Sequence, residues 1–158
     1  MEPGIALVTG AGRGIGRSTA LRLAELGMAV VLVSRSEGQL RETRDLVAGR
    51  GGRALVVPTD ISVPAAVDEL KRRVETDAGK PSVLINAAGI FGPIQLIWKT
   101  DPREWIETQL VNTIGPYLTC RAFVGNMIEA RWGRIINVTS AAALHEPGPV
   151  NSAYATSK

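Results

Sequence analysis

Two side chains near the end of the sequence have the types and spacing needed for acid–base chemistry. In "SAYATSK", the phenol of Tyr154 and the ammonium group of Lys158 stand four positions apart. Residues at this spacing share one face of a helix, so their polar ends can reach a common substrate. The ammonium charge stabilises a phenolate, which allows the phenol to exchange a proton with a substrate oxygen. Taken alone, such a pair is commonly no more than two neighbours on a helix surface.

A glycine-rich segment near the start of the chain has the pattern of a phosphate-binding loop. The segment "TGAGRGIG" at 9–16 follows a strand-like apolar run and leads into a helical pattern. Glycines let the backbone turn sharply and approach a pyrophosphate, and the following helix offers free N–H groups. Turns also use glycine for purely structural reasons, but this context favours a nucleotide. The predicted cofactor-binding residues of the segment are Gly10, Gly12, Arg13, Gly14, Ile15 and Gly16.

The residues after the second apolar run indicate which dinucleotide to expect. A cofactor without a 2′-phosphate is usually held by an acidic residue about 20 positions past the glycines. Here the strand ends in Ser34 and Arg35, with no carboxylate at that place. A guanidinium binds a phosphate through paired hydrogen bonds, and Arg13 can reach the same phosphate from the other side. We therefore expect NADP(H); NAD(H) is the alternative if Arg35 is only a solvated loop residue and Glu37 binds the ribose.

Short apolar runs alternate with longer helical patterns along the whole chain. Strands are predicted at 5–10, 29–34, 53–59, 82–88 and 134–140, and helices at 14–27, 37–50, 64–78 and about 102–131. The strand candidates are nearly continuous in hydrophobicity, as expected for parallel strands covered on both faces. This alternation predicts an α/β fold with a doubly wound, Rossmann-type parallel sheet in three layers.

Length and composition narrow the class of protein. A chain of 158 residues with 45% apolar and 21% charged residues suits a single globular domain over 1–158. The single Cys120 cannot form an internal disulfide, which favours a reducing, cytoplasmic compartment. The net charge is +3, but the fourteen arginines are scattered, so we expect no nucleic-acid partner. We also expect no membrane association and no bound metal.

These motifs together resemble the short-chain dehydrogenase/reductase family. The matching elements are "TGAGRGIG" at 9–16, "TDIS" at 59–62, "NAAG" at 86–89, "VNTIG" at 111–115, "INVTS" at 136–140 and "YATSK" at 154–158. They occur in the order typical of the family and span the whole chain. The resemblance implies adenine contacts from Asp60 and Ile61, and a cofactor cleft lined by Asn86, Ala87, Ala88 and Gly89. It also implies a catalytic tetrad of Asn112, Ser140, Tyr154 and Lys158.

The residues themselves are consistent with these roles. Ser140 can hold a substrate oxygen as it gains negative charge, while the cofactor supplies the hydride. Pro116 has no N–H and stands four positions after Asn112, so the carbonyl of Asn112 loses its usual helical partner. We expect a kink eased by Gly115, with the free carbonyl holding a water that relays protons to Lys158. The alternative is a helix bent simply to follow the sheet.

Several positions depart from the family pattern. Ala87 stands where a second asparagine is frequent, and Thr139 stands where a second serine is frequent. Fourteen positions separate Ser140 from Tyr154, one more than in many relatives, and His145 lies between them as an expected loop or substrate-wall residue. In the family, further helices and strands follow the catalytic lysine. We therefore expect this chain to be the N-terminal portion of a longer protein.

The sequence thus predicts an NADP(H)-dependent oxidoreductase acting on a carbonyl or secondary alcohol. The resemblance suggests a 3-oxoacyl-acyl-carrier-protein reductase as one candidate, with Arg131 and Arg134 facing an acidic carrier. A nucleotide-binding module without turnover is the alternative from another class. The predicted helix over 102–131 is apolar on two sides, which favours a homodimer or homotetramer through this helix. The alternative is that further C-terminal residues of the longer protein cover the second side within one chain.

Overall fold

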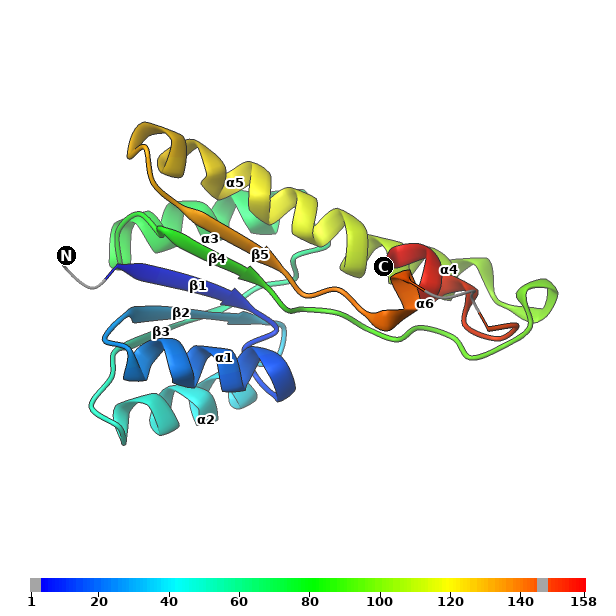
Figure 1. The fold of residues 1–158 in the computed structure, drawn as a ribbon, viewed down its shortest axis with the longest axis horizontal. Helices are drawn as coiled ribbons and strands as arrows, with labels where there is room; N and C mark the ends of the chain where they lie inside the picture. Colours follow the sequence, from blue (N-terminus) through cyan, green and yellow to red (C-terminus); the bar gives the residue numbers. More distant parts are fainter. Residues whose placement is uncertain (1–3, 145–147) are drawn as a thin grey trace.

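A five-stranded parallel sheet forms the centre of the protein (Figure 1). The computed structural model describes residues 4–144 and 148–158. The strands are β1 (Ile5–Thr9), β2 (Ala29–Ser34), β3 (Ala54–Pro58), β4 (Val83–Asn86) and β5 (Arg134–Asn137). Their order is β3-β2-β1-β4-β5, and every neighbouring pair is parallel. All five predicted strands are present, each within a few residues of its expected bounds.

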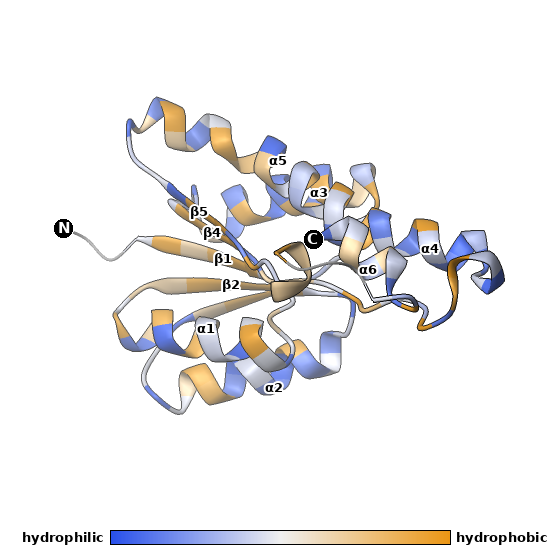
Figure 2. Cartoon of the chain, turned by 45° about the vertical axis from the view of Figure 1, so that its right-hand side comes forward, coloured by the Kyte–Doolittle hydropathy of each residue, from blue (hydrophilic) through white to orange (hydrophobic). Residues whose placement is uncertain are grey.

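Helices cover the sheet on both faces and give three layers. Helices α1 (Gly14–Glu25) and α2 (Glu37–Ala48) lie on one face, while α3 (Pro64–Asp77) and α5 (Gly115–Glu129) lie on the other (Figure 1). The strands are apolar along most of their length, whereas the helices alternate between polar and apolar faces (Figure 2). The predicted doubly wound, Rossmann-type sheet is therefore confirmed.

Two apolar cores lie between the three layers. The first joins the sheet to α3 and α5 and consists mainly of Leu7, Val31, Val33, Leu84, Val67, Leu70, Val74, Leu118, Ala122, Phe123 and Met127. The second joins the sheet to α1 and α2 and consists mainly of Ala6, Val8, Val30, Leu32, Ile85, Ala20, Ala24, Leu40 and Val47. Alternate residues of β1 and β2 face opposite cores, because successive side chains of a strand point to opposite faces. This alternation explains why the strands read as continuous apolar runs.

The predicted long helix is divided into three segments without a break in the chain. It consists of α4 (Pro102–Gln109), a π-helical segment η2 (Leu110–Ile114) and α5. In η2 the N–H of Gly115 donates to the carbonyl of Leu110, five residues earlier, instead of four. The wider π turn lies immediately before Pro116, which cannot donate a hydrogen bond in either register. The expected irregularity is thus present, but as a π segment that contains Asn112.

Strand β5 differs from the expectation that both faces of every strand are covered. All four of its residues are exposed, and Ile136 retains 52% of its accessible surface. The strand has β4 as its one neighbour in the described part of the chain. Its apolar side chains therefore lie open at the edge of the sheet.

Several short elements project past the carboxyl ends of the strands. They are η1 (Ile97–Lys99), α4, η3 (Ala141–Ala143) and α6 (Ser152–Ser157). In Figure 1 these elements lie beyond the carboxyl ends of the strands, and the C-terminal end of the chain lies among them. Within residues 4–144 and 148–158, no helix combines the length and apolar character required to cross a membrane.

Gly16 in α1 lies so close to the backbone of Gly10 that a side chain there should affect stability. A Cβ on Gly16 would overlap the carbonyl oxygen of Gly10, so we expect Gly16→Ala to lower the free energy of unfolding by about 1–3 kcal/mol. Gly38 in α2 is the matched control because a Cβ there meets open space. Gly38→Ala should raise the same free energy by about 0.5–1 kcal/mol. Urea unfolding of both variants measures the difference, and equal effects would contradict the packing argument.

Candidate active site

The sheet reverses its winding direction between β1 and β4. From β1 the chain winds outward to β2 and β3, and then returns to place β4 and β5 on the other side of β1. Ligands of open α/β sheets bind at such a point, beyond the carboxyl ends of the strands. A cavity of about 400 Å³ lies at this place. Its lining includes the predicted residues Gly10, Gly12, Arg13, Gly14, Ile15, Gly16, Ser34, Arg35, Asp60, Ile61, Ala87, Ala88 and Gly89.

One wall of the cavity is made by two loops in direct contact. Gly10 has a positive φ of +67°, and a Cβ there would lie 2.8 Å from Cα of Ala88. The hydroxyl of Thr9 accepts hydrogen bonds from the N–H groups of Ala87 and Ala88, each at 3.2 Å. Thr9 therefore fastens the loop after β4 to the glycine-rich loop after β1. Sequence reasoning missed this role, although Thr9 is the first residue of the glycine motif.

The other side of the glycine-rich loop is held by α2. The buried hydroxyl of Thr43 donates to the carbonyls of Ala11 and Gln39, both at 3.0 Å. The guanidinium of Arg17 donates to the carbonyl of Gly12 and to the hydroxyl of Thr43, the latter at 3.0 Å. These two side chains satisfy consecutive carbonyls of the loop and hold its shape. Arg17 lies only five positions from Gly12, but no local pattern could reveal Thr43, which lies 26 positions from Arg17 and 32 from Ala11.

The loop has the features required to hold a pyrophosphate. Helix α1 starts after Arg13, has no acidic residue in its first turn, and has no side-chain hydrogen bond at its N-cap. Its first N–H groups therefore face the cavity without an internal competitor, and the helix dipole favours an anion there. Gly14 is open to solvent on the side where a Cβ would stand. The residues present thus fit a dinucleotide phosphate.

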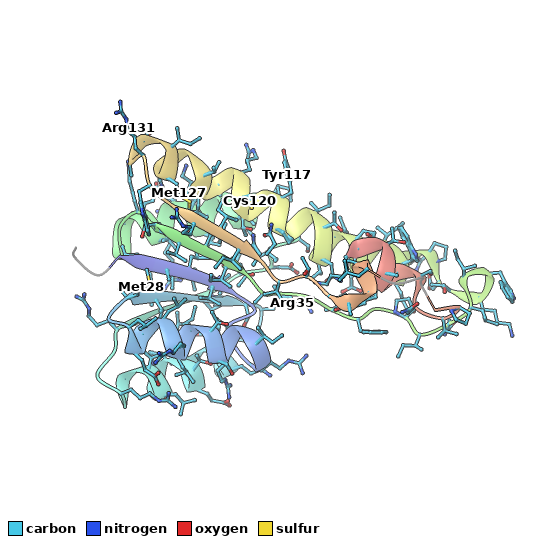
Figure 3. The ribbon with its side chains drawn as sticks, in the orientation of Figure 1. Met28, Arg35, Tyr117, Cys120, Met127 and Arg131 are labelled. Carbon is cyan, nitrogen blue, oxygen red and sulfur yellow. The ribbon has the colours of Figure 1, made fainter. Side chains whose placement is uncertain are left out.

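Arg35 and Glu37, the two residues considered for binding the cofactor ribose, differ in their position relative to the cavity. Arg35 lines the cavity, and Figure 3 shows it at the carboxyl end of the sheet. Glu37 is the first residue of α2, lies outside the lining, and forms an ion pair with Arg41 at 2.6 Å. The carboxylate of Glu37 is therefore already paired with a cation of its own helix.

Asp60 and Ile61, which follow β3, also line the cavity. Burial alone would raise the pKa of Asp60, but hydrogen bonds from Ser62 and the nearby charge of Arg35 outweigh it and lower the pKa. The Ser62 hydroxyl donates to Oδ1 of Asp60 at 2.6 Å, and the Ser62 N–H donates to the same oxygen at 3.0 Å. Ile61 packs against Gly115, where a Cβ would lie 2.7 Å from its Cδ1. Asp60 is thus kept ionised with its orientation fixed.

Asn86 occupies a different place from its three successors in "NAAG". It is buried and does not belong to the cavity lining. Its amide donates to Oδ1 of Asn137 at 2.9 Å, and its oxygen accepts from the hydroxyl of Thr119 at 2.7 Å. The amide also lies 3.5 Å from the sulfur of Cys120, whose pKa is raised by burial. Asn86 therefore connects β4 to β5 and α5 beneath the cavity.

Asn112 uses its side chain to hold the segment after Gly89. Its Oδ1 accepts from the N–H of Ile90 at 2.9 Å, and its Nδ2 donates to the carbonyl of Ile90 at 2.8 Å. The same Nδ2 lies 2.8 Å from the hydroxyl of Ser157, which donates to the carbonyl of Tyr154 at 2.8 Å. Asn112 thereby links the cavity wall to α6. The part played by Ser157 was not anticipated from the sequence.

Tyr154 and Lys158 lie together at the same end of the sheet. The Lys158 ammonium is 5.6 Å from the centre of the Tyr154 ring and donates to the carbonyl of Val138 at 3.1 Å. A Cβ on Gly89 would lie 3.7 Å from Lys158 Nζ, so the ammonium reaches the cavity wall. The ring of Phe91 stacks on Tyr154 with centroids 4.6 Å apart.

Ser140 stands at the start of η3, next to α6. Its hydroxyl accepts a hydrogen bond from the N–H of Ala142 at 3.2 Å, and its side chain is partly exposed. It therefore remains accessible to a substrate oxygen. His145 lies outside the described residues.

The two arginines considered for a carrier protein lie elsewhere. Arg131 follows α5, and Arg134 begins β5 beside the ring of Trp132. Figure 3 shows Arg131 at the opposite end of the sheet from Arg35. These charges therefore do not border the cavity, and they add nothing to the carrier-protein hypothesis for that site.

Comparison with known proteins identifies the family. The sequence model described as short chain dehydrogenase matches residues 4–158. This chain belongs to the short-chain dehydrogenase/reductase family. The short-chain reductase protein NovJ of Streptomyces niveus is 40% identical over 158 residues, which cover 99% of this chain and 59% of NovJ. The chain therefore spans less than two thirds of this relative.

Solved structures of similar proteins agree with the fold. An NAD+-bound xylitol dehydrogenase has a TM-score of 0.93 at 34% identity, over 98% of this chain and 59% of the other. A metagenomic short-chain oxidoreductase in complex with NADP also has a TM-score of 0.93, at 36% identity, over 98% of this chain and 70% of the other. One neighbour holds NAD+ and the other NADP, so the likeness is to nicotinamide-dependent oxidoreductases of both kinds.

The environment of Asp60 generates a prediction about pH. Because its pKa is lowered in the folded chain, its stabilisation is present above the pKa of the unfolded chain and is lost as pH falls through the folded pKa. Ser62→Ala should raise the pKa of Asp60 and lower the free energy of unfolding near pH 7 by about 0.5–1 kcal/mol, after allowance for solvent screening. Carboxyl titration by NMR and urea unfolding at several pH values measure both effects. Ser18→Ala at an exposed position of α1 is the control, and a loss that persists unchanged in acid would contradict this account.

Proposed function

We propose that this protein is an NADP(H)-dependent oxidoreductase that interconverts a carbonyl and a secondary alcohol. The observation that carries the proposal is the position of Lys158, whose ammonium lies against Gly89 in the wall of the cavity at the carboxyl end of the sheet. Tyr154 is one helical turn away on α6. The lysine of the predicted acid–base pair thus reaches the same cavity wall as the glycine-rich loop, which neither motif would require by itself.

The chemistry divides between the cofactor and the chain. When bound, a nicotinamide dinucleotide supplies or accepts a hydride at the substrate carbon. In the reductive direction Tyr154 donates its phenolic proton to the substrate oxygen, and in the oxidative direction it removes that proton. Ser140 donates a hydrogen bond to the same oxygen, and Lys158 stabilises the phenolate charge. Asn112 holds Ile90 and Ser157, and so keeps the cavity wall and α6 in register.

The preference for NADP(H) rests on the charges around β2. Arg35 and Arg13 both line the cavity, while Glu37 is paired with Arg41 and does not. A 2′-phosphate carries up to two negative charges and accepts paired hydrogen bonds from a guanidinium. This arrangement supports a phosphate partner at the ribose more than a carboxylate partner.

Two further properties belong to the proposal. Helix α5 and the segments before it expose Ile106, Leu110, Ile114, Tyr117, Val124 and Ile128 while burying an opposite face. Such a two-sided apolar helix supports a homodimer or homotetramer through this surface, on which Figure 3 shows Tyr117 pointing outward. The free Cys120 supports a reducing, cytoplasmic location.

The role of Tyr154 leads to a direct test of catalysis. Tyr154→Phe removes the exchangeable proton and keeps the stacked ring, so turnover should fall by about 10²- to 10⁴-fold. Binding of NADPH, followed by its fluorescence, should change little. Tyr117→Phe is the control because it removes the same hydroxyl at a position outside the cavity lining. Unchanged turnover in Tyr154→Phe would overturn the acid–base assignment, and cofactor binding without turnover in the unmodified protein would favour a non-catalytic module.

The role of Arg35 leads to a test of cofactor preference. Arg35→Asp replaces a phosphate partner with a repelling charge, so the Kd for NADPH should rise by at least about tenfold while that for NADH rises far less. Arg44→Asp makes the same charge change on α2, away from the cavity, and should leave both values unchanged. Equal weakening of both cofactors by Arg35→Asp would contradict the proposed phosphate contact.

A further inference from the structure

Arg35 has an acidic neighbour that comes from the opposite side of the cavity. One guanidinium nitrogen of Arg35 lies 3.8 Å from a carboxylate oxygen of Glu107 in α4. Arg35 follows β2, whereas Glu107 stands one helical turn before Val111, which also lines the cavity. The ion pair therefore joins two elements that approach the cavity from different directions.

The two carboxylates near Arg35, those of Asp60 and Glu107, have different partners. Asp60 is also close enough to interact with Arg35, but two hydrogen bonds from Ser62 hold its Oδ1 in place. Within the described part of the chain, Glu107 has Arg35 as its one ion-pair partner. Glu107 is therefore the carboxylate whose position depends on Arg35.

We propose that Glu107 tunes the choice between the two dinucleotides by competing with a 2′-phosphate for Arg35. This inference rests on the proposed function, and it assigns a specificity role to a residue outside the family motifs. A phosphate bound at Arg35 must displace the Glu107 carboxylate or share the guanidinium with it. It also brings up to two negative charges close to that carboxylate. A dinucleotide without the 2′-phosphate neither displaces the Glu107 carboxylate from Arg35 nor brings negative charge close to it.

The expected size of this effect follows from the exposure of the pair. The two side chains retain 57% and 56% of their accessible surface, so solvent screens their attraction. Interactions of exposed charges correspond to changes of about two- to fivefold in an equilibrium constant. They also weaken with salt, because the screening length falls to about 3 Å in 1 M salt. Glu107 is therefore expected to adjust cofactor preference, while Arg35 provides the contact itself.

The substitution Glu107→Gln tests this role because it removes the charge and keeps the shape of the side chain. The Kd for NADPH, measured by fluorescence titration at low salt, should fall by about two- to fivefold. The Kd for NADH should change by less than about twofold, and the difference should shrink at high salt. Glu104→Gln removes the same charge one turn earlier on α4. Glu104 forms no ion pair with the described residues, so this change should alter the ratio less.

A double-mutant cycle identifies the partner. In an Arg35→Ala background, Glu107→Gln should no longer improve NADPH binding, because the guanidinium for which the carboxylate competes is gone. An equal gain for both dinucleotides, a gain that persists without Arg35, or the same gain from Glu104→Gln would overturn the inference. Binding of neither dinucleotide to the unmodified protein would overturn the proposed function as well. NADPH binding that depends on Arg35 but not on Glu107 would overturn this inference alone.

Discussion

The contact between the loops that follow β1 and β4 is the constraint on which the rest of the site depends. The two loops leave neighbouring parallel strands and pass so closely that a Cβ on Gly10 would meet the backbone of Ala88. Thr9 closes the contact by accepting two N–H groups that would otherwise have no partner in the sheet. A buried N–H without a partner is costly, so this arrangement determines where the cavity wall stands. The cavity opens beside this wall because the strand order reverses there.

Side-chain amides extend the same wall toward the acid–base pair. Asn86 connects β4 to β5 and α5 below the cavity, and Asn112 connects the segment after Gly89 to α6 above it. An amide suits this position because it donates and accepts at once, and can pair with a backbone N–H and carbonyl together. The short helix α6 has fewer than two turns and would be marginal in isolation. Its contacts through Ser157 and Lys158 hold it against the wall.

Charge is arranged along the cavity in a definite order. The N-terminal end of α1 and Arg13 lie near the glycine-rich loop, Arg35 lies at the end of β2, and the carboxylates of Asp60 and Glu107 stand around Arg35. The glycine-rich loop thus offers positive charge to phosphates, while the positive charge of Arg35 is partly neutralised by the two carboxylates beside it. Small changes in that balance can alter the preference between dinucleotides without disturbing the fold.

The sequence by itself determined the layered α/β fold, the five strands and the segments that border the cavity. These features follow from local periodicity and from glycine spacing, which depend on residues close in the chain. Tertiary structure decided the contacts that join distant residues, namely Thr43 on Ala11 and Arg17, Asn112 on Ile90, and Arg35 on Glu107. It also decided that the break before Pro116 is a π segment and that β5 is an exposed edge. No local sequence pattern predicts these features, because each depends on which elements become neighbours once the strands have their order in the sheet.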